Sequence, residues 1–188
     1  MTQSAQSAPS SDLLYILSGG PGSGKSTLIE ALSAHGVASM PEAGRAVIRD
    51  QVATGGNALP WADRSAFADL MFAHDLRSYD QALALGAPVL FDRGLPDVAG
   101  YLRLCELPVP EPMLRQIHFR RYNRSVFIAP PWHEIFTQDA ERKQSFAEAE
   151  ATCEVMRQTY LELDYELVTL PLAPVEARVQ FVLSQMGF

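Results

Sequence analysis

A glycine-rich segment followed by a lysine and two hydroxyl residues is the part of this sequence best suited to chemistry. Residues 19–27 read Gly-Gly-Pro-Gly-Ser-Gly-Lys-Ser-Thr and fit the pattern G-x-x-x-x-G-K-S. Glycines let the backbone turn so that several N–H groups point toward one anion, and a helix starting there adds the positive end of its dipole. The segment therefore predicts a cradle for the phosphates of a nucleoside triphosphate.

Each residue type in this segment has an expected role. Lys25 would reach the β- and γ-phosphates, and the hydroxyl of Ser26 would bind Mg²⁺. The expected nucleotide-binding residues are Gly20, Gly22, Ser23, Gly24, Lys25, Ser26 and Thr27. The alternative is a glycine-rich turn that binds nothing. The apolar strand before the segment and the helix-forming run after it favour the phosphate cradle.

Glu42 follows the second expected strand and is the acidic residue that matters most for the predicted reaction. Transfer of a phosphoryl group to an alcohol is helped by a carboxylate that accepts the hydroxyl proton, and a strand end beside the γ-phosphate suits that role. The alternative is that Glu42 caps the following helix or pairs with Arg45. Arg45 itself is expected either to bind the acceptor or to be a structural partner of Glu42.

Asp92 and Arg93 follow a third expected strand, Val-Leu-Phe. Asp92 at that position is a candidate Mg²⁺ ligand, direct or through water, and the alternative is a carboxylate that caps the next helix before Gly94. Arg93 is expected to bind the acceptor or to neutralise phosphate oxygens in the transition state. It is equally expected as a structural partner of Asp92 or Glu42.

A polar segment at about residues 131–145 is expected to form a lid, in which Arg142 would reach the phosphates as the lid closes. The alternative is an exposed arginine on a solvated loop. Asp139 and Lys143 belong to the same segment. Three aromatic residues, Trp61, Tyr101 and Trp132, are candidates for stacking on a flat acceptor, although single aromatic residues more often serve packing.

The elements that would position these residues alternate between strand and helix. We expect strands at residues 13–18, 37–40, 88–91, 125–129 and 165–170, and helices at residues 25–34, 44–52, 61–85, 95–105, 111–122, 146–163 and 174–186. This alternation predicts an α/β fold with a five-stranded parallel sheet between helices on both faces. Ligands of such sheets bind at the carboxyl ends of the strands, which is where the charged residues fall.

Composition and charge narrow the class of protein. The chain has 188 residues and a net charge of −7, and its basic cluster is short: Arg120, Arg121 and Arg124. A nucleic-acid partner is therefore not expected, because binding a phosphodiester backbone needs a broader positive surface. No apolar run approaches the ~20 residues of a membrane span, and two widely spaced cysteines suit a reducing cytoplasm. We expect a disordered tail at residues 1–12, a single domain at residues 13–188, and a monomer or homodimer.

The sequence resembles a P-loop ATPase or kinase-like family, the AAA-type domain group similar to the kinase domain of the bifunctional regulator of NAD biosynthesis. The resemblance rests on residues 19–27, 41–45, 91–94, 130–132, 139–142 and 160–171. It implies a three-layer P-loop fold of the nucleoside- and nucleotide-kinase type, a base at Glu42, a metal- and phosphate-binding pair at Asp92 and Arg93, and a lid arginine at Arg142. The riboside-kinase role of the bifunctional relatives does not carry over, and the acceptor stays open.

Two classes of function follow. The first is a Mg-ATP-dependent phosphotransferase that moves the γ-phosphate to a hydroxyl of a nucleoside, a riboside or a similar small metabolite. The second is a nucleotide-dependent switch that hydrolyses slowly and signals by conformation. The N-K-x-D motif of guanine-specific switches is absent from the sequence, and Asp92-Arg93-Gly94-Leu95, directly after the third expected strand, misses D-x-x-G by one place. Both observations favour ATP as the nucleotide. A mechanical or oligomeric ATPase would need more chain than is present.

Overall fold

Five parallel strands in the order β2-β3-β1-β4-β5 form the centre of the structure, a computed structural model that describes residues 11–136 and 145–188. The strands are β1 Leu14–Gly19, β2 Ala38–Met40, β3 Val89–Asp92, β4 Ser125–Ala129 and β5 Glu166–Thr169. Each pair of neighbours is parallel, and Leu17 of β1 lies opposite both Asp92 of β3 and Phe127 of β4. The expected five-stranded parallel sheet is confirmed.

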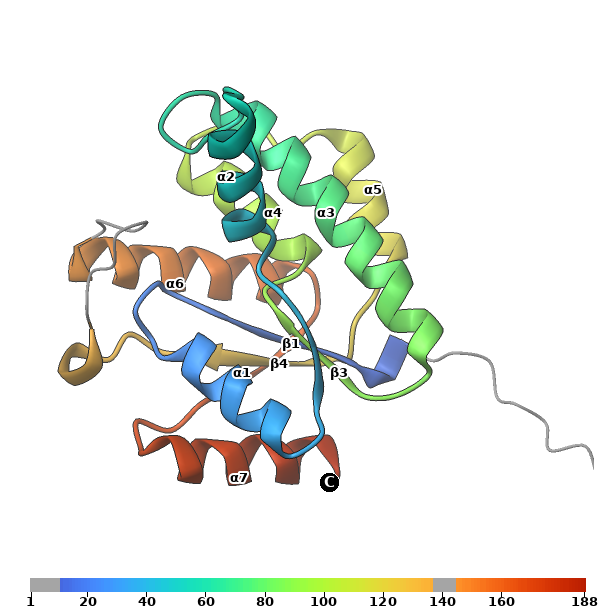
Figure 1. Cartoon of the computed structure of the whole chain (residues 1–188), viewed down its shortest axis with the longest axis vertical. Helices are drawn as coiled ribbons and strands as arrows, with labels where there is room; N and C mark the ends of the chain where they lie inside the picture. The colour runs from blue at the N-terminus through green and yellow to red at the C-terminus, as the bar shows by residue number, and fades with distance from the viewer. Residues whose placement is uncertain (1–10, 137–144) are drawn as a thin grey trace, which may run out of the picture.

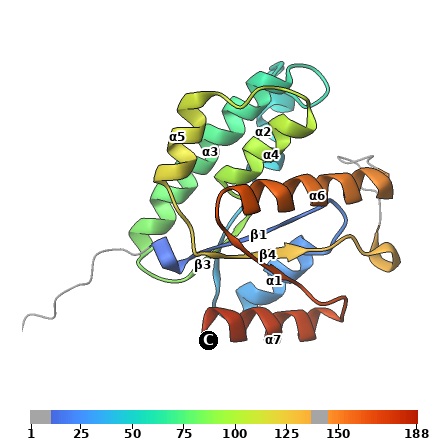
Figure 2. The same ribbon diagram turned by 180° about the vertical axis from the view of Figure 1, so that it is seen from behind.

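Helices cover both faces of this sheet. They are α1 Lys25–Ala34, α2 Ala43–Thr54, α3 Arg64–Leu85, α4 Leu95–Leu104, α5 Glu111–Phe119, α6 Phe146–Glu162 and α7 Val175–Met186. Figure 1 shows α1 and α7 on one side of the strands and α6 with α4 on the other, and the reverse view in Figure 2 shows the same division. Helices α2, α3 and α5 extend the second layer beyond the sheet.

The alternation of side chains along β1 explains why both faces need cover. Leu14 and Ile16 point into a core shared with α3, α4 and α6, whereas Tyr15 and Leu17 point into a second core shared with α1 and α7. All four side chains are buried. A strand whose two faces are both apolar is stable only between two layers, and β1 is therefore the central strand of the sheet.

Most boundaries differ from the sequence prediction by one or two residues, and three of the differences have a clear physical reason. Helix α3 begins at Arg64 and not at residue 61, because the Asp63 side chain accepts a hydrogen bond from N of Ala66 (2.9 Å) and caps the helix there. Helix α5 ends at Phe119, since Tyr122 turns inward and is buried. Residues Ser11–Leu13 form a 3₁₀ turn, which Asn123 holds by donating to the carbonyl of Asp12 (2.6 Å), so residues 11 and 12 are part of the fold.

The carboxyl ends of β1, β2 and β3 bring the candidate residues to one edge of the sheet. The loop after β1 leads directly into Lys25, the first residue of α1. Glu42 follows β2 and Pro41, and β3 ends at Asp92. Asp139, Arg142 and Lys143 lie outside the described residues, as does most of the expected lid. No helix within the described ranges has the length and apolar character needed to cross a membrane.

Candidate active site

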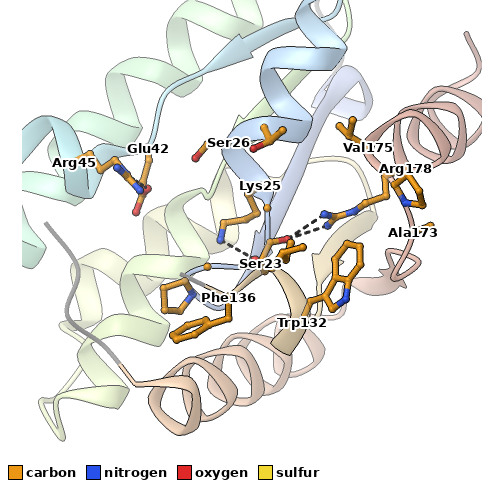
Figure 3. A pocket seen from close by; sticks show the side chains of 16 residues that line it. Ser23, Lys25, Ser26, Glu42, Arg45, Trp132, Phe136, Ala173, Val175 and Arg178 are labelled. Carbon is orange, nitrogen blue, oxygen red and sulfur yellow. Dashed lines mark hydrogen bonds and ion pairs between the residues drawn. The ribbon is translucent and has the colours of Figure 1, made fainter. Parts of the chain in front are cut away.

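The phosphate loop folds around the amino group of its own lysine. The Lys25 side chain is 5% exposed, and its Nζ atom donates to the carbonyl oxygen of Gly20 (2.6 Å) and approaches Oγ of Ser23 (3.4 Å). The Ser23 hydroxyl in turn donates to the same Gly20 oxygen (2.8 Å). Figure 3 shows Lys25 lying over the loop. The positive charge is thus held above the turn that the sequence predicts for phosphate.

Two glycines of the loop are required by its geometry. Gly24 has φ 75°, in the left-handed region, and forms the residue before α1. A Cβ on Gly20 would lie 2.4 Å from the carbonyl oxygen of Ala149 in α6, so the loop packs against the helix as closely as its backbone allows. The pattern of glycines therefore fits both the turn and its packing.

A cavity of about 510 Å³ opens beside the loop. Its lining includes loop residues 21–27, Glu42 and Arg45 from the end of β2 and the start of α2, Trp132 and Phe136 after β4, and Arg178 of α7. In Figure 3, Glu42 and Arg45 lie across the cavity from Trp132 and Arg178. Its volume is within the range of small-molecule and cofactor sites.

Arg178 is a residue that the sequence analysis missed. It is 4% exposed, and its Nη1 and Nη2 atoms both donate to the carbonyl oxygen of Ser23, at 3.1 and 3.2 Å. Burial lowers the pKa of Arg178, and its Nε atom has no hydrogen-bond partner among the described residues. The Trp132 ring lies 5.9 Å from its guanidinium carbon. A buried cation beside the phosphate loop suits an anionic ligand.

Glu42 lies between two arginines. Its side chain is 8% exposed, with Oε2 at 3.3 Å from Nε of Arg45 and Oε1 at 3.5 Å from Nε of Arg93. It occupies the N-cap position of α2, but in the described structure its side chain forms no cap hydrogen bond there. The capping alternative is therefore wrong, and the expected pairing with Arg45 is present. This pairing leaves the carboxylate at the wall of the cavity.

Asp97 of α4 is a second residue that the sequence analysis missed, and it anchors Arg93. Its Oδ1 accepts from Nη1 of Arg93 (3.0 Å) and from the Ser18 hydroxyl, while its Oδ2 accepts from N of Gly94 (2.9 Å) and from the Tyr160 hydroxyl. The carboxylate that caps α4 is thus Asp97 and not Asp92. An acidic residue three positions after Gly94 was the available sequence signal.

Arg93 lies half-buried among carboxylates, with its side chain 15% exposed, and has an unusual backbone conformation. Burial alone would lower its pKa, but the charges of Asp97, Glu42 and Asp92 outweigh burial and raise the pKa above its ordinary value. Its φ is 70°, which is uncommon for a residue other than glycine and is often found at functional sites. Its backbone N donates to the carbonyl of Leu17 (3.0 Å), which fixes the turn to β1.

A second cavity of about 300 Å³ lies on the other side of Glu42. Glu42, Arg93 and Asp97 line it together with Asp75 of α3, a residue that the sequence analysis did not consider. Asp75 is 4% exposed, and burial raises its pKa to about 6, with the nearby charges of Asp97 and Glu42 acting in the same direction and His74 opposing them. The cavity walls include Trp61 and Tyr101, two of the three aromatic candidates.

The oxygen ligands predicted for Mg²⁺ share a third cavity. Ser26 and Asp92 both line it, together with Glu42 and Arg45. Hard oxygen donors fit Mg²⁺, which usually takes one or two protein ligands and completes its shell with phosphate oxygens and water. No group of three or more His, Cys, Asp or Glu side chains in residues 11–136 and 145–188 is placed to hold a metal alone. The site therefore fits a metal that arrives with a nucleotide.

Comparisons with known proteins agree with this geometry. The sequence model of the AAA domain family matches residues 14–178. A comparison with curated proteins finds no match.

Two solved structures share the fold. The YorR protein from Bacillus subtilis, in complex with phosphorylated GDP, is 13% identical with a TM-score of 0.56, over 93% of this chain and 95% of that chain. Shikimate kinase from Aquifex aeolicus is 18% identical with a TM-score of 0.53, over 93% of this chain and 96% of that chain. At these identities the likeness shows the fold alone, which is that of P-loop kinases.

Proposed function

The chain belongs to the AAA domain family, and from this membership and the site geometry we propose that it is a Mg-ATP-dependent phosphotransferase. Its acceptor is a hydroxyl group of a small metabolite, of the nucleoside or riboside type. The nucleotide would bind in the cavity beside the phosphate loop, and the acceptor would bind in the cavity lined by Asp75 and Arg93.

The observation that carries the proposal is the position of Glu42. Its side chain lines the phosphate-loop cavity, the acceptor cavity and the cavity that contains Ser26 and Asp92. Pro21 also lines both of the first two cavities, so the phosphate loop and the acceptor cavity share a wall. A protein that only hydrolysed ATP would need space for no more than a water molecule beside the γ-phosphate. This chain has a second cavity large enough for an organic acceptor.

The reaction follows from these positions. The acceptor hydroxyl oxygen forms a bond to the γ-phosphorus while the bond from that phosphorus to the β–γ bridging oxygen breaks, and ADP leaves. The hydroxyl proton passes to the carboxylate of Glu42 and then to water. Arg45 and Arg93 favour the ionised form of Glu42 before the transfer.

Other residues would hold the nucleotide. The backbone N–H groups of residues 20–24 and the start of α1 bind the phosphates, and Lys25 turns from Gly20 toward the β- and γ-oxygens. Ser26 and Asp92 would hold Mg²⁺, which when bound screens the charge of the phosphates. Arg178 adds a buried positive charge at the same loop. The role expected of Arg142 stays a prediction, as does a cytoplasmic location.

A test of the proposal measures Mg-ATP-dependent ADP release across nucleosides, ribosides, sugars and nucleoside monophosphates, with Lys25→Ala as the blank. We expect one chemical class of acceptor to stimulate release strongly. Glu42→Gln should then lower kcat by about 10²–10⁴-fold while ATP still binds, because the isosteric amide cannot accept the proton. Glu150→Gln, at an exposed position of α6, is the matched control and should keep the wild-type rate.

Two outcomes would contradict the proposal. A slow ADP release that needs Lys25 but does not respond to any acceptor favours the nucleotide-dependent switch. Near-normal transfer by Glu42→Gln contradicts the assignment of Glu42 as the base, although a phosphotransferase would remain.

A further inference from the structure

The acceptor cavity has walls suited to a flat apolar group. Aromatic and aliphatic side chains from α3, α4, α6 and the turn before α3 line most of it, among them Trp61, Phe67, Met71, Val98, Tyr101 and Met156. The Phe67 and Tyr101 rings meet edge to face, with centroids 5.4 Å apart. Trp61 is 64% exposed, although it lines the cavity, and so lies toward solvent.

The charged residues of this cavity are mostly acidic. Glu42, Asp75 and Asp97 line it with one guanidinium, that of Arg93, and no second lysine or arginine belongs to its lining in the described residues. Arg93 is already engaged by the carboxylates of Asp97 and Glu42, at 3.0 and 3.5 Å. An anion entering this cavity would therefore meet three carboxylates and a cation whose charge is largely satisfied.

Of the three carboxylates that line the cavity, Asp75 has the weakest ion pair with a basic side chain of the chain itself. Arg93 binds Asp97 and Glu42, whereas the basic side chain paired with Asp75 in the described structure is the imidazole of His74, with Nδ1 at 3.9 Å from Oδ1. That distance is too long for a good hydrogen bond. A buried carboxylate in an apolar cavity gains most from a ligand that donates a hydrogen bond to it.

We infer that the acceptor is an uncharged or cationic hydroxyl compound with a flat apolar group, that Asp75 selects it by accepting a hydrogen bond from it, and that anionic compounds are excluded. This inference deepens the proposed function and rests on it, because it takes the compound bound in this cavity to be the phosphoryl acceptor. The chemistry of the cavity can nevertheless be measured without any phosphoryl transfer.

Three matched compounds test the charge preference: benzylamine in its protonated form, benzyl alcohol and benzoate. They share one flat ring and carry a cationic, a neutral and an anionic group. The sequence has two tryptophans, of which Trp61 lines the acceptor cavity and Trp132 the phosphate-loop cavity. The indole N–H resonance of Trp61, assigned by comparison with Trp61→Phe, therefore reports on this cavity in a ¹⁵N-labelled full-length chain.

We expect benzylamine and benzyl alcohol to shift the Trp61 resonance at concentrations at least tenfold lower than benzoate requires. Asp75→Asn should weaken the binding of benzylamine severalfold and change that of benzyl alcohol less. Asp69→Asn makes the same substitution at an exposed position of the same helix and should change neither.

Three results would overturn the inference: benzoate binding as tightly as benzylamine, Asp75→Asn leaving benzylamine affinity unchanged, or no shift of the Trp61 resonance by any of the three compounds. Failure of the proposed function gives a different result. In that case the amine still binds beside Trp61, but no hydroxyl compound stimulates ADP release.

Discussion

The guanidinium of Arg93 joins two carboxylates from different parts of the chain, with Nε at 3.5 Å from Oε1 of Glu42 and Nη1 at 3.0 Å from Oδ1 of Asp97. Glu42 is the residue before α2, whereas Asp97 belongs to the first turn of α4. Through Asp97 the guanidinium is also connected to the hydroxyl groups of Ser18 and Tyr160. The position of the proposed base is thus set by a network that reaches β1 and α6.

Arg93→Lys should disturb this connection without removing the positive charge. A lysine has one ammonium group and cannot span both carboxylates as the planar guanidinium does. Losing one charged hydrogen bond of roughly 1.5–3 kcal/mol would lower kcat/KM for the acceptor by about 10- to 100-fold. ATP affinity should change little. A steady-state assay in which each substrate is varied in turn checks this prediction. An equal rise in the KM for ATP and in the KM for the acceptor would contradict it.

The sequence predicted the strands and the phosphate loop well because these depend on local patterns. The apolar run before residue 19 fixes β1, and the glycines followed by Lys25 fix the loop. The sequence placed Glu42 and Asp92 at one edge of the sheet because parallel strands bring their carboxyl ends together, and their roles stay predictions. These are rules that relate spacing along the chain to position in a sheet.

Asp75, Asp97 and Arg178 were not found because nothing local marks them. Asp75 is one of several acids in a long helix, and its burial depends on how α3 packs in the folded chain. Arg178 is near the end of the chain, 155 positions from the Ser23 carbonyl that it binds. Such residues acquire their roles from contacts between distant segments, which periodicity and spacing do not report.

Tyr160→Phe should separate positioning from stability. Burial, and then the charge of Asp97, raises the pKa of Tyr160 well above its ordinary value, so the hydroxyl stays protonated and donates to Asp97. The phenylalanine keeps the ring, which packs edge to face on Tyr165 with centroids 5.5 Å apart. Removing a donor to a buried charge should lower the free energy of unfolding by about 1–3 kcal/mol.

Urea unfolding checks this loss of stability in Tyr160→Phe, and acceptor kinetics on the same variant check positioning. If Asp97 orients Arg93, the KM for the acceptor should rise at temperatures where the variant is fully folded. A loss of stability with unchanged kinetics would show that the Tyr160 hydroxyl contributes to folding only.

Asp75→Asn should raise stability in a pH-dependent way. In the folded chain the pKa of Asp75 is about 6, above its ordinary value of 3.8, because burial and the charges of Asp97 and Glu42 exceed the opposite effect of His74. The buried hydroxyl of Tyr122 lies near the same carboxylate. The folded state thus binds the proton more tightly than the unfolded state, and the wild type loses stability as pH rises from about 4 through about 6.

The amide of Asp75→Asn does not ionise, so the variant should not show this loss. The difference in the free energy of unfolding between variant and wild type should grow by up to about 3 kcal/mol between pH 4 and pH 7.5. Urea titrations at both pH values measure it, with Asp69→Asn as the control. A difference that stays constant with pH would mean that Asp75 has an ordinary pKa in the folded chain.

Arg178→Ala tests whether the last helix belongs to the nucleotide site. The guanidinium donates twice to the Ser23 carbonyl, and a Cβ on Gly24 would lie 2.8 Å from its Nη1 atom, so the side chain packs directly on the phosphate loop. Removing it takes away two charge-assisted hydrogen bonds and a buried positive charge. ATP affinity measured by titration calorimetry should fall by about tenfold or more. Arg115→Ala on α5, an exposed arginine, should bind ATP as the wild type does.

Arg178→Lys distinguishes charge from geometry at this position. A lysine keeps the charge but offers a single ammonium in place of the two nitrogens that bind Ser23. If charge dominates, Arg178→Lys should bind ATP with an affinity close to that of the wild type. If the shape of the loop dominates, Arg178→Lys and Arg178→Ala should be equally weak. Wild-type affinity in both variants would mean that Arg178 only fastens α7 to the loop and does not act on the nucleotide.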